Sequence, residues 1–218
     1  MATITTEHYI AHSAAQMEQA ELFFGHGTDN AWDEACWLVE TLLKRDGIHD
    51  IQPGLPLSPA QVAAADALLA ERLRTRKPLA YLLREAWFCG LPFYVDERVL
   101  VPRSPIAELI QNGFEPLLKH PPRRVLDLCA GGGCIGIACA LAFPQASVVL
   151  ADISADALDV ARINVERFAL GERVTLLQSD LFAKVQGHFD LIVSNPPYVA
   201  QDEYDELPDE FKREPLLG

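Results

Sequence analysis

The first third of the chain shows apolar residues spaced as on one face of an α-helix. Asp29 or Asn30 can cap one such helix, whose apolar positions recur at helical intervals at Trp32, Ala35, Cys36, Val39, Leu42 and Leu43. Residues 58–61, Ser-Pro-Ala-Gln, have the pattern of a capping box at the start of a second helix. An earlier helix is expected over residues 14–22. These patterns predict a helical domain over residues 1–85, whose expected role is to recognise the substrate.

Residues 86–103 have a different pattern, in which two short apolar runs flank Gly90. Such runs around a glycine turn predict a β-hairpin, followed by extended chain as far as Arg103. A helix is then expected from about Pro105 to Leu118. The hairpin region is therefore predicted to link two domains.

From Arg124 onward, strand-like apolar runs alternate with helical patterns, which is typical of a wound α/β sheet. Strands are predicted at residues 125–129, 147–151, 174–177 and 189–194, and Ser154 is expected to cap the helix after the second of them. The fourth run is apolar enough to predict a buried parallel strand. Residues 202–210 are expected to form an acidic loop. The pattern predicts a Rossmann-like second domain over residues 104–218.

The composition excludes several function classes. The chain has 218 residues, of which 50% are hydrophobic, and a formal net charge of −13. This charge repels nucleic acid phosphates and favours a basic partner. No apolar stretch is long enough to cross a bilayer, and residues 1–7 lack the form of a signal peptide. We expect a soluble, cytoplasmic protein that does not bind DNA directly.

The five cysteines and six histidines do not have the spacing of a metal site. Cys129, Cys134 and Cys139 are too far apart for a Cys-x-x-Cys clamp, and the histidines are scattered. The odd number of cysteines argues against a set of disulfides. We expect buried thiols and no metal.

A glycine-rich loop follows the first predicted strand of the second domain. Gly131, Gly133 and Gly136 match the dinucleotide fingerprint, and glycines here let a ligand approach the backbone at a helix N-terminus. Asp152 lies about 20 residues further on, where an acid can accept from ribose hydroxyls. A nicotinamide dinucleotide and S-adenosylmethionine are both compatible with this loop.

The fourth predicted strand ends in Asn195, Pro196, Pro197 and Tyr198. Two prolines remove two backbone donors and favour extended chain, so the Asn195 side chain and the Pro196 carbonyl are available as acceptors. Tyr198 adds an aromatic face. This arrangement suits a planar group that carries an NH2, such as an amide or a nucleobase amine.

Two features favour methyl transfer over hydride transfer. Asp127 lies just before the glycines, where it would repel a pyrophosphate but attract an ammonium group. The Asn195–Tyr198 corner accepts an amine and offers no group for hydride transfer. Both features are compatible with S-adenosylmethionine as the cofactor.

Several segments of the sequence together resemble the HemK-type family of protein glutamine methyltransferases. They are residues 127–136 (DLCAGGGCIG), 151–158 (ADISADAL) and 194–199 (SNPPYV), with support from 77–83 (KPLAYLL) and 100–103 (LVPR). The branch called PrmB is similar in residues 24–30 (FGHGTDN) and 86–90 (AWFCG). The resemblance implies a class I methyltransferase fold that uses S-adenosyl-L-methionine. It also implies, as substrate, a glutamine on the third protein of the large ribosomal subunit.

The resemblance implies a role for each matched residue. Asp127 would meet the ammonium of the cofactor, Asp152 its ribose, and Asp180 or the neighbouring backbone its adenine. The other implied cofactor contacts are Ala130, Gly131, Gly133, Ile153, Leu181 and Asn195. Catalysis would rest on Asn195, Pro196 and Tyr198, and substrate binding on these three with Pro197 and Arg103. Gly132 stands where the family usually has serine or threonine.

Several alternatives stay open at this point. The substrate could be a release factor, or the adenine amine of DNA, although the acidic charge argues against DNA. The chain could also be a non-catalytic adenosylmethionine-binding module in ribosome assembly. Family members ordinarily continue with further strands, so the resemblance implies a C-terminally incomplete sheet with the fourth strand at its edge.

Overall fold

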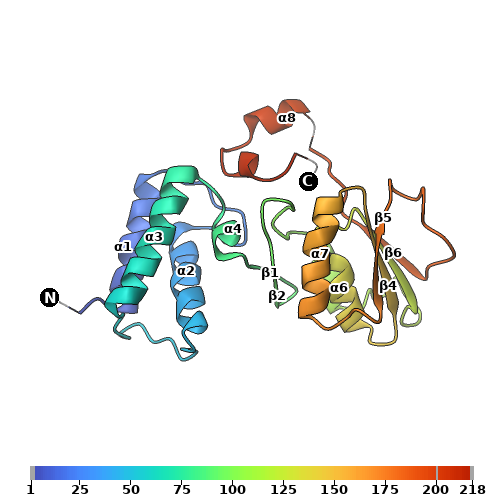
Figure 1. Cartoon of the computed structure of the whole chain (residues 1–218), viewed down its shortest axis with the longest axis horizontal. Helices are drawn as coiled ribbons and strands as arrows, with labels where there is room; N and C mark the ends of the chain where they lie inside the picture. The colour runs from blue at the N-terminus through green and yellow to red at the C-terminus, as the bar shows by residue number, and fades with distance from the viewer. Residues whose placement is uncertain (1–2, 200, 217–218) are drawn as a thin grey trace. The chain divides into compact units, whose positions relative to one another are not determined.

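The computed structural model describes residues 3–199 and 201–216. The chain divides into two compact units (Figure 1). A helical unit consists of residues Met1–Leu83 and Glu206–Arg213, and a sheet unit consists of Arg84–Asp205 and Glu214–Gly218. Residues 206–213 therefore belong with the helical unit, a membership that the sequence pattern does not reveal. The predicted C-terminal boundary at residue 218 lies outside the described residues.

The helical unit begins with four helices, of which α1, α2 and α3 pack side by side (Figure 1). They are α1 (Thr6–Gln19), α2 (Ala31–Arg45), α3 (Pro59–Thr75) and α4 (Leu79–Leu83). Asn30 caps α2, and Ser58 with Gln61 forms the predicted capping box of α3. The centre of the unit holds Met17, Leu38, Leu43 and Leu79 among other buried apolar side chains.

Two expectations about these helices are wrong. The first helix begins at Thr6 rather than at residue 14, because the Thr5 side chain accepts from the His8 N–H and caps it. Trp32, expected in the core stripe of α2, is 47% exposed, because Ala31 and Ala35 occupy the buried face of the helix. The predicted helical spacing of the buried residues is therefore correct, but Trp32 is not one of them.

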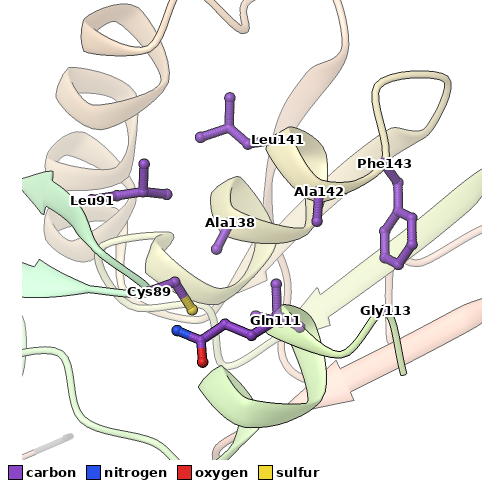
Figure 2. Close-up of a pocket in the computed structure, with 9 residues that line it drawn as sticks. Cys89, Leu91, Gln111, Gly113, Ala138, Leu141, Ala142 and Phe143 are labelled. Atoms are coloured by element: carbon purple, nitrogen blue, oxygen red, sulfur yellow. The ribbon is translucent and has the colours of Figure 1, made fainter. Parts of the chain in front are cut away.

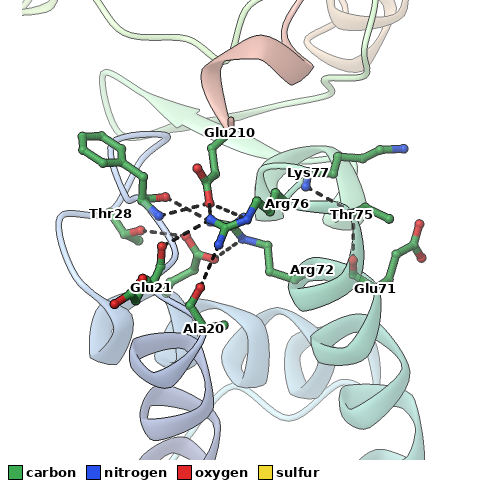
Figure 3. A network of polar contacts seen from close by, with 11 residues as sticks. Ala20, Glu21, Thr28, Glu71, Arg72, Thr75, Arg76, Lys77 and Glu210 are labelled. Atoms are coloured by element: carbon green, nitrogen blue, oxygen red, sulfur yellow. Dashed lines mark hydrogen bonds and ion pairs between the residues drawn. The ribbon is translucent and has the colours of Figure 1, made fainter. Parts of the chain in front are cut away.

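A buried cluster of charges joins residues 206–213 to the helices of this unit (Figure 3). Arg72, which is fully buried, donates to Glu34 at 2.6 Å and lies 3.9 Å from Glu210. Glu210 accepts from Arg76 at 2.8 Å and from the Phe23 N–H at 3.1 Å. Buried charges persist only when they are paired in this way. Glu210 is thus part of the interior of the helical unit.

The expected acidic loop at residues 202–210 is wrong in its local structure. The chain forms a helix, α8 (Gln201–Glu206), and then a single turn of 3-10 helix, η1 (Phe211–Arg213). The Phe211 ring packs against Phe23 at 5.5 Å and against His26 at 4.4 Å between ring centroids. These contacts, together with Glu210, order a stretch whose sequence is dominated by acids.

The sheet unit holds a parallel sheet with the strand order β5-β4-β3-β6. The strands are β3 (Arg124–Leu128), β4 (Ser147–Asp152), β5 (Val174–Gln178) and β6 (Leu191–Ser194). Helices α6 (Cys134–Ala142) and α7 (Ala155–Arg167) cover one face (Figure 1). On the other face, Leu126 and Leu128 pack with Val185 and Phe189. This is the predicted Rossmann-like arrangement.

The predicted hairpin forms from β1 (Ala86–Phe88) and β2 (Leu91–Phe93). Its turn residues Cys89 and Gly90 both have positive φ, at 51° and 74°, as in the turns that suit the twist of paired strands. Helix α5 (Ile106–Gln111) is shorter than the predicted span of 105–118. Gly113 has a φ of 61° and Pro116 follows, so the helical path cannot continue.

Strand β6 differs from the prediction of a buried strand. It pairs with β3 alone among the described strands, and Ile192 is 50% exposed while Val193 is buried. The apolar run reflects its β propensity rather than burial on both faces. Asp190, expected inside the strand, instead accepts from the N–H groups of Arg123 and Arg124.

Within the described part of the chain, no helix has the length and apolar character that membrane crossing requires.

Candidate active site

Four parallel strands bring their carboxyl ends to one edge of the sheet. Leu128 of β3 is in register with Ala151 of β4 and with Ser194 of β6, and Asp152 is in register with Gln178 of β5. The glycine loop, Ile153, Leu181 and Asn195 follow directly from these ends. The carboxyl edge is where open α/β sheets bind their ligands.

Asp127 lies in β3 with no exposed surface. Its Oδ2 accepts from the Gly136 N–H at 2.8 Å, while no described residue hydrogen-bonds to its Oδ1. Burial raises the pKa of this carboxyl to about 7. A Cβ at Gly136 would lie 2.2 Å from Leu150 of β4 and 3.0 Å from the Asp127 Cβ of β3, so glycine lets α6 pack this close to both strands.

The glycine loop has left-handed backbone at two positions. Gly133 has a φ of 81°, and a Cβ there would lie 2.9 Å from Leu150. Gly131 has a φ of 52°, but a Cβ there would meet no atom of the other described residues within 4 Å, its two chain neighbours aside. Gly133 is therefore required for packing, whereas Gly131 borders open space that a ligand can enter.

Asp152 is held rigidly at the end of β4. Its Oδ2 accepts from the Gly131 N–H at 2.8 Å and its Oδ1 accepts from the Ser154 N–H at 2.9 Å. Each carboxylate oxygen has a further lone pair, so Asp152 can still accept from two hydroxyl groups. Ala130 is buried, and its N–H and carbonyl bond to Ala151 and Gly133, so its predicted cofactor contact stays a prediction.

An apolar rim follows the ends of β4 and β5. Ile153, Leu181 and Phe182 are each more than half exposed, and Leu181 has a φ of 43°. Ser179 fixes this turn, because its hydroxyl donates to the Leu181 carbonyl and accepts from the Lys184 N–H. Asp180 is exposed beside the rim. Phe182, an aromatic residue two positions after Asp180, was not among the predicted site residues but lies on this rim.

The Asn195–Tyr198 corner leaves β6 at the same edge. Ser194 ties it to β3, because its hydroxyl donates to the Leu128 carbonyl at 2.9 Å. Asn195 is partly buried, Pro196 and Pro197 are exposed, and Tyr198 is 80% exposed. The Tyr198 ring is therefore accessible to an incoming group.

Arg103, predicted to bind the substrate, is engaged within the sheet unit. Its guanidinium makes two bonds to Glu214, at 2.8 and 2.6 Å, and Glu214 also accepts from the Val101 N–H. Glu214 is only 7% exposed. The carboxylate that Arg103 meets in this structure is thus internal, and its contact with a substrate stays a prediction.

A separate hollow of about 410 Å³ lies between the hairpin, α5 and α6 (Figure 2). Cys89, Leu91, Ala138, Leu141 and Phe143 line it, with Gln111 as a polar side chain at its border. None of the predicted site residues lines this hollow. Among the described residues, no group of three or more histidine, cysteine or acidic side chains can hold a metal ion.

Comparison with known proteins decides the family. A family model described as "Methyltransferase small domain" matches residues 110–211. The ribosomal protein uL3 glutamine methyltransferase of Francisella tularensis subsp. tularensis (strain SCHU S4 / Schu 4) is 44% identical over 220 residues, which cover 98% of this chain and 69% of the relative. The protein of the same name from Burkholderia pseudomallei (strain K96243) is 44% identical over 226 residues, covering 98% of this chain and 73% of the relative. The chain belongs to the ribosomal protein uL3 glutamine methyltransferase family.

This membership confirms the predicted glutamine methyltransferase family and its ribosomal-protein branch. Solved methyltransferases are also similar to parts of the chain. The T. Thermophilus 16S rRNA N2 G1207 methyltransferase (RsmC), in complex with AdoMet and guanosine, has a TM-score of 0.41 and 25% identity, covering 52% of this chain and 32% of its own. The ribosomal protein L11 methylase of Lactobacillus delbrueckii subsp. bulgaricus has a TM-score of 0.35 and 30% identity, covering 46% and 52% respectively.

Proposed function

We propose that this chain methylates the side-chain amide nitrogen of a glutamine on ribosomal protein uL3, with S-adenosyl-L-methionine as the methyl donor. Two relatives that carry this activity in their names are 44% identical over nearly the whole chain. The observation that carries the proposal is the position of Asn195, which leaves β6 beside the glycine loop at the carboxyl edge of the sheet.

The residues of this edge fit the donor. Asp127 has a buried oxygen without a hydrogen bond to any described residue, which suits an ammonium group. Gly131 borders open space, and Asp152 has lone pairs left for two ribose hydroxyls. Ile153, Leu181 and Phe182 offer apolar surface for a flat base. When bound, S-adenosylmethionine supplies a methyl group that is already activated for transfer.

Residues Asn195–Tyr198, which follow β6, act on the glutamine amide. An amide nitrogen is a poor nucleophile, because its lone pair is shared with its own carbonyl. The Asn195 Oδ1 and the Pro196 carbonyl each accept one N–H of the amide, which raises electron density on nitrogen and fixes its direction. Tyr198 packs on the amide plane. The methylated nitrogen loses its extra proton readily, so no strong base is required.

The charge of the chain fits a ribosomal protein substrate. Proteins that bind RNA phosphates are basic, and a net charge of −13 attracts them over long range. The helical unit, with its own core, is the part we assign to substrate recognition. A ribosomal protein substrate supports a cytoplasmic location for this activity.

Asn195→Ala tests the proposal, with Asn112→Ala as the matched control, because Asn112 is exposed at the end of α5. Purified uL3 is incubated with labelled S-adenosylmethionine and each protein. Asn195→Ala should lower the rate about 100-fold or more, as misplaced reacting groups do, and should bind the donor within a few-fold of the unsubstituted protein. Loss of donor binding together with activity would instead give Asn195 a structural role.

The same assay separates the alternatives. Release factors and DNA at low salt replace uL3 in parallel reactions, and labelling of either one in place of uL3 would contradict the substrate assignment. Donor binding with no labelling of any substrate would favour a non-catalytic binding module.

A further inference from the structure

We infer that Asn164 is a positioning residue that holds the glycine loop in its binding shape, an inference that rests on the proposed function. Asn164 lies in α7 and is 1% exposed. It donates to the Gly132 carbonyl at 2.9 Å. Its hydrogen bonds to described residues go to Gly132 and Tyr94, neither of which is a predicted cofactor contact, so its effect on the donor is expected to pass through the loop.

The hydrogen bonds of Asn164 use its whole amide group. The Nδ2 also donates to the Tyr94 carbonyl at 3.0 Å, and the Oδ1 accepts from the Tyr94 N–H at 2.7 Å. The side chain therefore pairs with Tyr94 as a neighbouring strand would, while its second N–H reaches Gly132. Aspartate of the same size has no donor for either carbonyl, and an aliphatic side chain has neither donor nor acceptor.

The glycine loop is held from two sides. Asp152 accepts from the Gly131 N–H, and Asn164 donates to the next carbonyl along the chain, that of Gly132. Consecutive glycines have large conformational freedom, and a ligand must bear the entropy of ordering them unless the protein does so first. Both bonds join residues of this chain, so they can order the loop without any contact to the donor.

The space around Gly132 agrees with this role. A Cβ at Gly132 would lie 3.5 Å from Val99 and from Val160, and 3.8 Å from the Asn164 Nδ2. Val99 belongs to the segment that follows Tyr94, so Asn164 fixes this segment and the loop to the same helix. Glu85, at the start of the hairpin, also reaches α7 through an ion pair with Arg167 at 3.5 Å. The hairpin and the glycine loop are therefore expected to order together.

The test compares Asn164→Ala with Val165→Ala. Val165 is buried in the same helix and packs among apolar residues, so its truncation lowers stability without removing a bond to the loop. The affinity for S-adenosylhomocysteine is measured by calorimetry, with Tm and the KM for uL3. Asn164→Ala should bind about tenfold more weakly, as expected for a lost hydrogen bond and a looser loop. Val165→Ala should bind within about twofold while its Tm falls.

Unchanged S-adenosylhomocysteine affinity in Asn164→Ala would overturn the inference, as would equal losses of affinity in both variants. If Asn164→Ala does not fold, Asn164→Asp takes its place, because it keeps the side-chain volume and the acceptor for the Tyr94 N–H, while in its ionised form it has no donor for the Gly132 or the Tyr94 carbonyl. Failure of the proposed substrate has a different signature, in which the unsubstituted protein binds S-adenosylhomocysteine but does not methylate uL3. If the unsubstituted protein binds no S-adenosylhomocysteine, both the inference and the donor assignment are wrong.

Discussion

Asp127 accepts a hydrogen bond from the Gly136 N–H at 2.8 Å and has no exposed surface. Burial raises the pKa of Asp127 from 3.8 to about 7. The folded chain therefore holds this proton more tightly than the unfolded chain does. The resulting stabilisation is fully present below about pH 4 and is lost as the pH rises through about 7. A site that is costly to ionise in the free protein is suited to a cationic ligand.

Asp127→Asn should separate stability from binding. The amide can still accept from Gly136 but does not ionise, so the stability of the variant relative to the unsubstituted protein should rise as the pH increases from 3.8 to about 7 and then level off. Donor binding should fall, because Asp127 is the proposed partner of the ammonium group. Urea unfolding across this window and calorimetry with S-adenosylmethionine measure the two effects. Parallel pH profiles for the two proteins would show that Asp127 does not titrate there.

Gly131→Ala should obstruct the ligand more than it harms the fold. The left-handed backbone at 52° makes alanine cost about 1–2 kcal/mol, but the added Cβ meets no atom within 4 Å in the part of the chain that the structure describes, apart from its chain neighbours. Gly113→Ala is the matched control, since its φ is 61° and its Cβ also meets nothing. Both variants should lose similar stability in urea, and only Gly131→Ala should lose donor affinity. Equal affinities would place the ligand away from Gly131.

Glu210→Ala should destabilise the helical unit. Its removal leaves the fully buried Arg72 with Glu34 as its charged partner and removes the partner of Arg76, which costs about 3–5 kcal/mol when a buried pair is broken. Asp209→Ala is the control, because Asp209 is exposed next to it and should change stability by about 0.5 kcal/mol or less. Chemical denaturation followed by tryptophan fluorescence measures both. A Glu210 variant as stable as the control would show that residues 206–213 are dispensable for this unit.

Arg103→Ala and Glu214→Gln should have the same effect on the KM for uL3, because the two side chains form one bidentate pair. The double variant should add nothing to either single variant, as for residues that act as a unit. Steady-state kinetics with varied uL3 measures all three. If Arg103→Ala raises the KM further than Glu214→Gln does, Arg103 also contacts the substrate.

The features that were predictable from sequence depend on residues near one another in the chain. The caps of Asn30, Ser58 and Ser154 act within one helical turn, and each forms as expected. Asp127 and Asp152 were predictable as candidate site residues because each lies near the carboxyl end of a strand. Parallel strands meet at one edge, so their joint location follows from order along the chain.

The features that were missed depend on contacts between distant residues. Asn164 bonds to Tyr94 and Gly132, and Glu210 bonds to Phe23 and Arg76, yet neither residue belongs to a local pattern. From sequence alone, an asparagine inside a helix or an acid in an acidic stretch is predicted to be exposed to solvent. The exposure of Ile192 could not be predicted, because an apolar strand sequence does not show which of its two faces is covered by other residues.

Mass spectrometry of uL3 after reaction with this protein and S-adenosylmethionine tests the central claim most directly. Fragmentation assigns any added methyl group to a residue and to an atom type. We expect one added methyl on a glutamine side-chain amide, present with the unsubstituted protein and with Asn112→Ala and lost with Asn195→Ala. Unmodified uL3, or a methyl on a residue other than glutamine, would contradict it.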